Sequence, residues 1–427
     1  MTCGAPPAAL DADLIVVGIS ELATPTGNVP RTGADAGKIR VIEDAAVAVR
    51  DGRIAFVGTE KDLRATVRLV AGGHTVDARG GTVLPGFVDA HTHLPFAGWR
   101  ETEFNERLRG ATYSDIAARG GGILSTVRET RALAEGELAA TVRRRLDDIL
   151  RLGTTTVEAK SGYGLDPETE VRQLAALRDA SVDHPVEVVR TFLGAHTVPA
   201  EYRADRETYL SSVIDTMLPE VVEAGLADYA DVFVDDHAFS IDEARRVLRA
   251  AADAGLGVRV HADQLADDGG AALAAEVGAA SADHLEFASD RGLEAMAAAG
   301  TVGILLPAAT FFLMMDARPP GRRLVEAGVP VAVATDFNPG TCPCESMSAA
   351  LWFACLTGGL DVDEAITATT LNAACSLGRG REIGSLEPGK RADLVVHDVP
   401  NRYHLVYRFG IPRVRKVLAG GRLVVDH

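Results

Sequence analysis

The chain has 427 residues, of which 47% are hydrophobic and 24% charged, and its formal net charge at pH 7 is -17. These proportions are typical of a globular protein with a large core, and the negative charge argues against nucleic acid or an anionic membrane surface as a partner. With no run of 18 apolar residues and no basic leader followed by an apolar stretch, we expect neither a membrane span nor a signal peptide, and a cytoplasmic protein. An odd number of cysteines, five, argues against a disulfide framework.

The first part of the chain is predicted to be all-β. Residues 11–19 are apolar and β-branched, and residues 39–58 form two such runs around Asp51-Gly52, which is a hairpin signal. A further run covers residues 74–83. We assign residues 1–84 to the N-terminal part of a small β-sandwich.

From residue 85 the sequence alternates between strands and helices. Eight strands that alternate with helices predict a (β/α)8 TIM-type barrel over residues 85–384. An open doubly wound sheet would need a Gly-rich phosphate turn after its first strand, where this chain has H-T-H instead. The predicted strands are 85–88, 154–157, 186–193, 230–234, 257–260, 279–282, 302–306 and 329–334, and the predicted helices include 138–152, 167–180, 240–254 and 263–277.

The tail returns to β-structure. Residues 385–427 contain two apolar β-branched runs and a hairpin signal at Gly420-Gly421. Neither terminal segment is long enough to enclose a core alone. We therefore expect both termini to build one β-sandwich beside the barrel.

Polar residues follow the ends of several predicted barrel strands, where barrel enzymes place their chemistry. His91 and His93 point to the same side of a strand because they are two residues apart. With His261 and Asp336 they make three imidazoles and one carboxylate, which suit one divalent metal ion per chain, with Zn²⁺ as first choice and iron as second. His284 is either a fifth ligand or a base or hydrogen-bond donor above the metal, and we favour the second role.

Two further groups leave alternatives open. Lys160 is either a carbamylated lysine that bridges two metal ions or the ion-pair partner of Glu158 or a nearby Asp, and we favour the ion pair. Cys342 and Cys344 are either ligands of a second metal or two buried small apolar side chains, and we favour burial.

Several motifs together resemble the amidohydrolase superfamily, whose members hydrolyse C–N bonds with a metal-activated water. They are P-G-F-V-D-A-H-T-H, T-V-E-A-K-S-G-Y-G-L, T-F-L-G-A-H-T-V-P, V-H-A-D-Q-L, S-A-D-H-L, A-T-D-F-N-P-G and G-S-L-E-P-G-K-R-A-D-L-V-V. More narrowly, they are similar to the branch that opens the ring of 4-imidazolone-5-propionate to give N-formimino-L-glutamate in histidine degradation.

The resemblance implies roles for individual residues. The four metal ligands would be His91, His93, His261 and Asp336, and His284 would be catalytic. The substrate-binding residues would be Arg100 and Tyr113 for the substrate carboxylate, Tyr163 and His196 for the ring, and Asn338, Gly340 and Thr341 after the last strand. A homodimer is also implied. Arg100 agrees with the chemistry, since an anionic substrate needs a fixed cation in an acidic protein.

One position departs from the pattern of some relatives. Gln264 stands where those relatives have a Glu that transfers protons, and an amide does not titrate. We expect Gln264 to orient the ring, Asp336 to take the proton of the water, and His284 to stabilise the oxyanion or share the role of base. The alternative function, a deaminase of a purine, pyrimidine or related ring, needs that Glu as a proton donor. A non-catalytic relative is expected to lose metal ligands, which this chain keeps.

Overall fold

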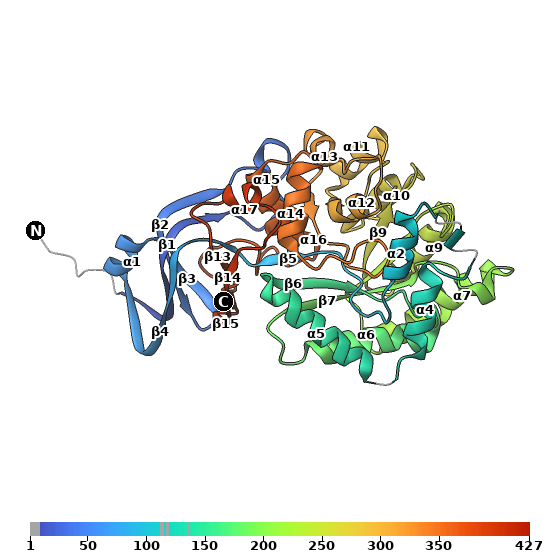
Figure 1. Cartoon of the computed structure of the whole chain (residues 1–427), viewed down its shortest axis with the longest axis horizontal. Helices are drawn as coiled ribbons and strands as arrows, with labels where there is room; N and C mark the ends of the chain where they lie inside the picture. Colours follow the sequence, from blue (N-terminus) through green and yellow to red (C-terminus); the bar gives the residue numbers. More distant parts are fainter. Residues whose placement is uncertain (1–8, 112–114, 117–118, 135) are drawn as a thin grey trace, which may run out of the picture.

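The computed structural model describes residues 9–111, 115–116, 119–134 and 136–427. A barrel of parallel strands surrounded by helices occupies one end of the molecule, and a separate sheet occupies the other (Figure 1). This confirms the predicted fold class. The barrel is an eight-stranded parallel sheet of β5 (Phe87–Asp89), β6 (Thr154–Lys160), β7 (Glu187–Ala195), β8 (Tyr229–Phe233), β9 (Gly257–Ala262), β10 (Ser281–His284), β11 (Val302–Leu305) and β12 (Val331–Val333).

Helices alternate with the barrel strands along the chain, and they surround the sheet because their apolar faces pack against it. Helix α9 begins with the capping box of Ser240 and Glu243, which satisfies backbone N–H groups of its first turn. The helices are α1 (Glu60–Thr66), α2 (Glu101–Leu108), α4 (Ile123–Ala132), α5 (Glu137–Arg151), α6 (Pro167–Ser181), α7 (Arg206–Ser212), α8 (Leu218–Glu223), α9 (Ile241–Asp253), α10 (Gly270–Glu276), α11 (Asp290–Ala299), α12 (Pro307–Phe312), α13 (Gly321–Glu326), α14 (Met347–Leu356), α15 (Val362–Thr369), α16 (Leu371–Ser376) and α17 (His404–Tyr407).

One predicted helix was wrong in its first half. The helix expected over residues 263–277 begins only at Gly270, as α10. Asp263 has a φ of 51° and its carboxylate accepts hydrogen bonds from the N–H groups of Gly270 and Ala271. The preceding residues therefore form a loop that this carboxylate holds against the start of the helix.

Strands from both chain termini form one seven-stranded mixed sheet, with its own apolar core (Figure 1, blue and red). The two predicted hairpins are present: Asp51 and Gly52 join β2 to β3 with positive φ, and Gly420 and Gly421 join β14 to β15. The domain limits at residues 84 and 385 stay a prediction. The strands are β1 (Leu10–Thr24), β2 (Arg40–Arg50), β3 (Arg53–Thr59), β4 (Val67–Pro85), β13 (Leu394–His397), β14 (Val414–Ala419) and β15 (Arg422–Asp426), in the order β15-β14-β13-β4-β1-β2-β3.

The first and last barrel strands meet just beyond their carboxyl ends. The buried carboxylate of Asp89 accepts hydrogen bonds from the backbone N–H and the hydroxyl of Thr335 at 3.0 and 2.7 Å. Beyond this contact, the N–H of Asp336 donates to the carbonyl of His91, and the N–H of His93 donates to the carbonyl of Phe337. These bonds bring two expected metal ligands from the start of the barrel next to one from its end.

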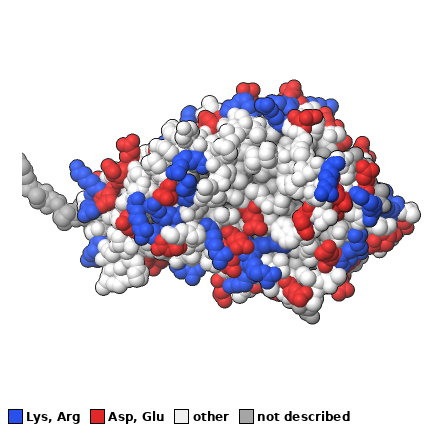
Figure 2. All heavy atoms as spheres, viewed as in Figure 1, with Lys and Arg blue, Asp and Glu red and all other residues white. Residues whose placement is uncertain are grey.

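Acidic and basic side chains are interspersed over the face of the molecule drawn in Figure 2. Among the described helices, none has the length and apolar character needed to cross a bilayer.

Candidate metal centre and active site

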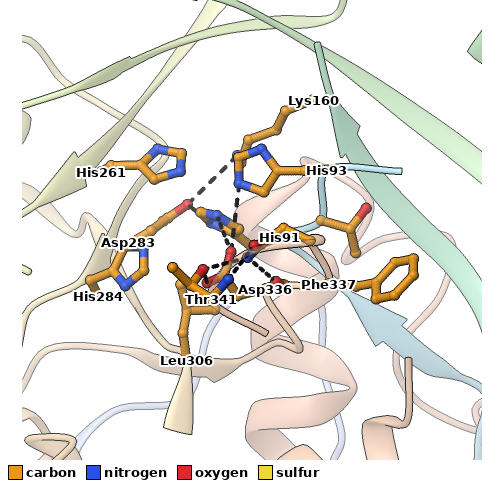
Figure 3. A network of polar contacts seen from close by, with 12 residues as sticks. His91, His93, Lys160, His261, Asp283, His284, Leu306, Asp336, Phe337 and Thr341 are labelled. Carbon is orange, nitrogen blue, oxygen red and sulfur yellow. Dashed lines mark hydrogen bonds and ion pairs between the residues drawn. The ribbon is translucent and has the colours of Figure 1, made fainter. Parts of the chain in front are cut away.

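Four of the predicted ligands converge at the carboxyl ends of the barrel strands (Figure 3). One nitrogen from each of His91, His93 and His261 lies within 4.8 Å of the others. Oδ1 of Asp336 lies 3.5 Å from Nε2 of His91 and 3.5 Å from Nε2 of His93. All four side chains are buried, so they form a compact N/O donor set in the barrel mouth.

The electrostatics of this cluster favour neutral imidazoles. Burial lowers the pKa of His91 and of His93 well below the ordinary value, and neighbouring cationic groups lower it further. Burial also lowers the pKa of His284 to about 3. Burial raises the pKa of Asp336, while His284 and His261 act in the opposite direction. A neutral imidazole is the form that binds a metal ion.

Two of the imidazoles are oriented by carboxylates behind them. Nδ1 of His91 lies 2.6 Å from Oδ2 of Asp283, and Nδ1 of His261 lies 3.0 Å from Oδ2 of Asp231. At His91 a proton on Nδ1 completes this hydrogen bond and leaves the Nε2 lone pair for a ligand, whereas the contact at His261 has an ion-pair distance without hydrogen-bond geometry. Both Nε2 atoms are buried and have no hydrogen-bond partner in the part of the chain that the structure describes.

Lys160 lies between the carboxylates of the two carboxylate–histidine pairs. Its fully buried ammonium lies 2.8 Å from Glu158, 2.9 Å from Asp231 and 3.8 Å from Asp283. Burial alone would lower the pKa of Lys160, but the charges of Asp231 and Glu158 outweigh it and raise the pKa. This confirms the predicted ion pair with Glu158 and a nearby Asp.

The charges around this network fit a cation at the donor set. Two buried cations, Lys160 and Arg259, face the carboxylates of Glu158, Asp231 and Asp283. Three carboxylates therefore face two cations, which leaves one uncompensated negative charge next to the imidazoles. A buried charge is costly unless another charge compensates it. A divalent ion held by His91, His93, His261 and Asp336 would supply that compensation.

Cys342 and Cys344 take no part in this cluster. Cys342 is buried and burial raises the pKa of its thiol well above the ordinary value, whereas Cys344 is partly buried. The groups of described residues that can hold a metal ion contain histidine and aspartate and neither cysteine.

A cavity of about 150 Å³ opens above the donor set. Its polar lining comes from several strand ends. The predicted site residues that line it are His93, Arg100, Tyr163, His196, His261, Gln264, His284, Asp336, Asn338 and Thr341. Tyr113 lies outside the described residues.

The ring-binding candidates form one wall of the cavity. The imidazole of His196 stacks on that of His93 at 5.3 Å between centroids, and its Nδ1 lies 2.9 Å from the carbonyl of Gly162. The ring of Tyr163 is buried 5.8 Å from His93. These flat groups can hold a planar heterocycle next to the metal ligands.

Arg100 reaches the cavity from the N-terminus of α2. Its Nε donates to Glu103 at 2.8 Å, which leaves the terminal amino groups for a ligand. The guanidinium packs directly on Gly340, where an added Cβ would lie 2.0 Å from Nη1 of Arg100. Gly340 therefore lies behind Arg100 and makes room for it rather than lining the cavity itself.

Asn338 shapes the turn after β12. Its side-chain carbonyl accepts from the N–H groups of Gly340 and Thr341, and its amide donates to the carbonyl of Asp336 and the hydroxyl of Thr341. This turn fixes Gly340 behind Arg100 and presents Thr341 to the cavity.

The supporting residues Asp231, Asp283 and Arg259 were given no role from the sequence. A signal was available: Asp231 lies in an otherwise apolar strand, β8, and Arg259 in β9. A charged residue inside a barrel strand must be paired in the core. The register between neighbouring strands decides which charged residues become partners, and this register cannot be read from the sequence.

Comparisons with known proteins agree with this geometry. The model of the amidohydrolase family matches residues 82–424. The chain belongs to the amidohydrolase family. The imidazolonepropionase of Symbiobacterium thermophilum is 50% identical over 415 residues, covering 97% of each chain, and that of Geobacillus kaustophilus is 48% identical over 387 residues, covering 90% and 91%.

Solved structures show the same fold at lower identity. A zinc-containing adenosine deaminase from Xanthomonas campestris superposes with a TM-score of 0.73 at 20% identity, covering 98% of this chain and 94% of that one. Guanine deaminase of E. coli superposes with a TM-score of 0.67 at 19% identity, covering 96% and 99%. These two neighbours support the architecture of barrel and terminal sheet.

Proposed function

We propose that this chain is an imidazolonepropionase, which adds water to 4-imidazolone-5-propionate, opens its ring and yields N-formimino-L-glutamate. The proposal is supported by the His91, His93, His261 and Asp336 cluster together with about one-half identity to relatives of that name over nearly the whole chain. The deaminase alternative rests on distant neighbours and needs a titrating acid where this chain has Gln264.

The reaction breaks the ring amide bond, and the residues of this site divide the work. A divalent ion held by the four ligands would supply Lewis acidity that makes water a nucleophile near neutral pH. The carboxylate of Asp336 takes a proton from the attacking water, whose oxygen bonds to the ring carbonyl carbon. His284 either stabilises the negative charge that develops on the carbonyl oxygen or shares the proton. As the C–N bond breaks, the proton passes to the departing ring nitrogen.

The remaining residues bind and orient the substrate. Tyr163 and His196 hold the ring against the ligands, and Gln264 hydrogen-bonds to it. Arg100 and Tyr113 take the propionate carboxylate, Asn338 and Thr341 close the pocket beside it, and Gly340 leaves room for the Arg100 guanidinium.

We propose Zn²⁺ as the ion and iron as the second choice, because three imidazoles and one carboxylate suit both. Elemental analysis of the purified chain tests this choice. We further propose a homodimer in the cytoplasm, on the family resemblance, and the solution mass of the purified protein tests the oligomeric state.

The deciding experiment follows imidazolone propionate with the purified, metal-loaded protein. Loss of the ultraviolet absorbance of the ring, with N-formimino-L-glutamate as product, supports the proposal. Release of ammonia from a purine or pyrimidine, with no ring opening, would support the deaminase alternative instead.

Replacing Arg100 by Ala should chiefly raise KM. The lost charged hydrogen bond is worth roughly 1.5–3 kcal/mol, or about 10- to 100-fold in KM. Gly340→Ala should act in the same direction, because its Cβ takes the space of the Arg100 guanidinium. Steady-state kinetics measures both variants, and an unchanged KM for Arg100→Ala would remove Arg100 from the pocket.

Replacing Gln264 by Glu should leave kcat within a few-fold of the wild type. Glu keeps one acceptor oxygen at the position where Gln264 lines the cavity. Gln264→Leu, which removes every polar contact of that side chain, is the matched variant and should lower kcat/KM. A large gain in rate for Gln264→Glu would place the proton path at this residue and contradict the roles given to Asp336 and His284.

A further inference from the structure

The backbone at the carboxyl end of β10 is strained. His284 and Leu285 have φ values of 81° and 72°, so two successive residues other than glycine lie in the left-handed region. Each such residue costs about 1–3 kcal/mol and persists only where its surroundings hold it. The turn places the side chains of His284 and Glu286 together inside the barrel mouth, and both are buried.

These two side chains leave complementary atoms unpaired. Nδ1 of His284 and Oε2 of Glu286 are both buried without a hydrogen-bond partner among the described residues. The two atoms are 4.0 Å apart. An unpaired buried polar atom is costly, and catalytic hydrogen bonds are often long before substrate binds. A small rotation of either side chain would join them.

Glu286 is held in place from its other side. The hydroxyl of Thr310, in α12, donates to Oε1 of Glu286 at 2.7 Å. Oε1 is thus occupied, and Oε2 is the oxygen left to face His284. The ring of His284 in turn lines the cavity near Asp336 (Figure 3).

We propose that Glu286, held by Thr310, is the positioning residue of His284: it accepts a hydrogen bond from Nδ1–H and thereby fixes the tautomer whose Nε2 lone pair faces the cavity. This inference rests on the proposed function and deepens it. A neutral imidazole carries one proton, so a proton on Nδ1 makes Nε2 an acceptor. His284 therefore shares the role of base and does not donate to the oxyanion.

Glu286 would also stabilise the ring after it has accepted a proton. When His284 shares, at Nε2, the proton that Asp336 takes from the water, the ring becomes an imidazolium, and a carboxylate beside Nδ1 favours that charge. When the ring returns the proton to the departing nitrogen, the neutral tautomer with Nδ1–H is restored.

The test uses the metal-loaded full chain with Glu286→Gln, His284→Ala and the double variant. We expect Glu286→Gln to lower kcat about 10- to 100-fold, as substitutions of partners behind catalytic groups do, with KM and metal content unchanged. In the His284→Ala background the same substitution should have no further effect, because Glu286 acts through His284. An unchanged kcat for Glu286→Gln, or equal losses in both backgrounds, overturns the proposal.

A milder pair of variants applies if Glu286→Gln does not fold. Thr310→Val should lower kcat in the same direction by less, whereas Thr369→Val, which removes another buried helical hydroxyl bonded to the carbonyl four residues before it, should leave kcat unchanged. Equal effects of the two would overturn the proposal.

A second readout needs no substrate, so it separates this inference from the proposed function. Nitrogen-15 shifts of the His284 ring, assigned by their loss in His284→Ala, report which nitrogen carries the proton. We expect the proton on Nδ1 in the wild type and a shift toward Nε2 in Glu286→Gln or, in its place, Thr310→Val. A wild-type His284 ring that is protonated at Nε2 overturns the proposal. If the proton is on Nδ1 but the enzyme does not open the substrate ring, only the proposed function is overturned.

Discussion

His91→Ala is expected to leave the purified chain with no bound metal and no turnover. His91 belongs to the donor set that could hold the ion, with its Nε2 3.5 Å from Asp336 and its ring 4.5 Å from that of His261. Removing it also takes away the hydrogen bond between Nδ1 of His91 and the carboxylate of Asp283. Elemental analysis and the ring-opening assay measure the two losses.

His74→Ala is the matched control, since His74 is an exposed histidine on β4. It should keep both the metal and the activity of the wild type. Full activity in a His91→Ala chain shown to be metal-free would refute the metal-dependent mechanism.

Lys160→Met is expected to have the largest effect on stability. Met has nearly the length of Lys but no charge, so Asp231 would lose its ammonium partner and Glu158 would keep only Arg259, 3.9 Å away. Breaking a buried pair in this way costs about 3–5 kcal/mol of unfolding free energy. Urea denaturation of the purified chain measures the loss.

Lys416→Met provides the comparison. Lys416 pairs with Asp426, which is about half exposed, so that pair is worth at most about 1 kcal/mol. Equal losses for the two variants would mean that the Lys160 network contributes no more than a surface ion pair.

The sequence predicts the parts of this protein whose signals are local. The Asp51-Gly52 hairpin and the alternation of strands and helices depend on neighbouring residues, and the structure contains both. The meeting of His91, His93, His261 and Asp336 was also predictable, because each lies at or just beyond the carboxyl end of a barrel strand and all these ends lie on one face.

The missed features depend on contacts between distant segments. The loop before Gly270 forms because Asp263 accepts hydrogen bonds from the helix start, and a helical apolar pattern does not reveal this. Asp231 and Asp283 acquire their partners from the register of β8, β9 and β10. The proximity of Glu286 to His284 was missed for a different reason, since it depends on a local backbone turn that residue types alone do not specify.

The bonds between Asp89 and Thr335 join positions 246 residues apart in the chain. His91 and His93 lie on one side of that seam and Asp336 on the other, so a chain still being synthesised has no complete donor set for an ion until nearly all of the barrel has emerged. The ion would then bind only after β5 and β12 have met. Once bound, it would hold these two strands together. Removing the ion with a chelator should therefore weaken the contact between β5 and β12 before it weakens the rest of the barrel.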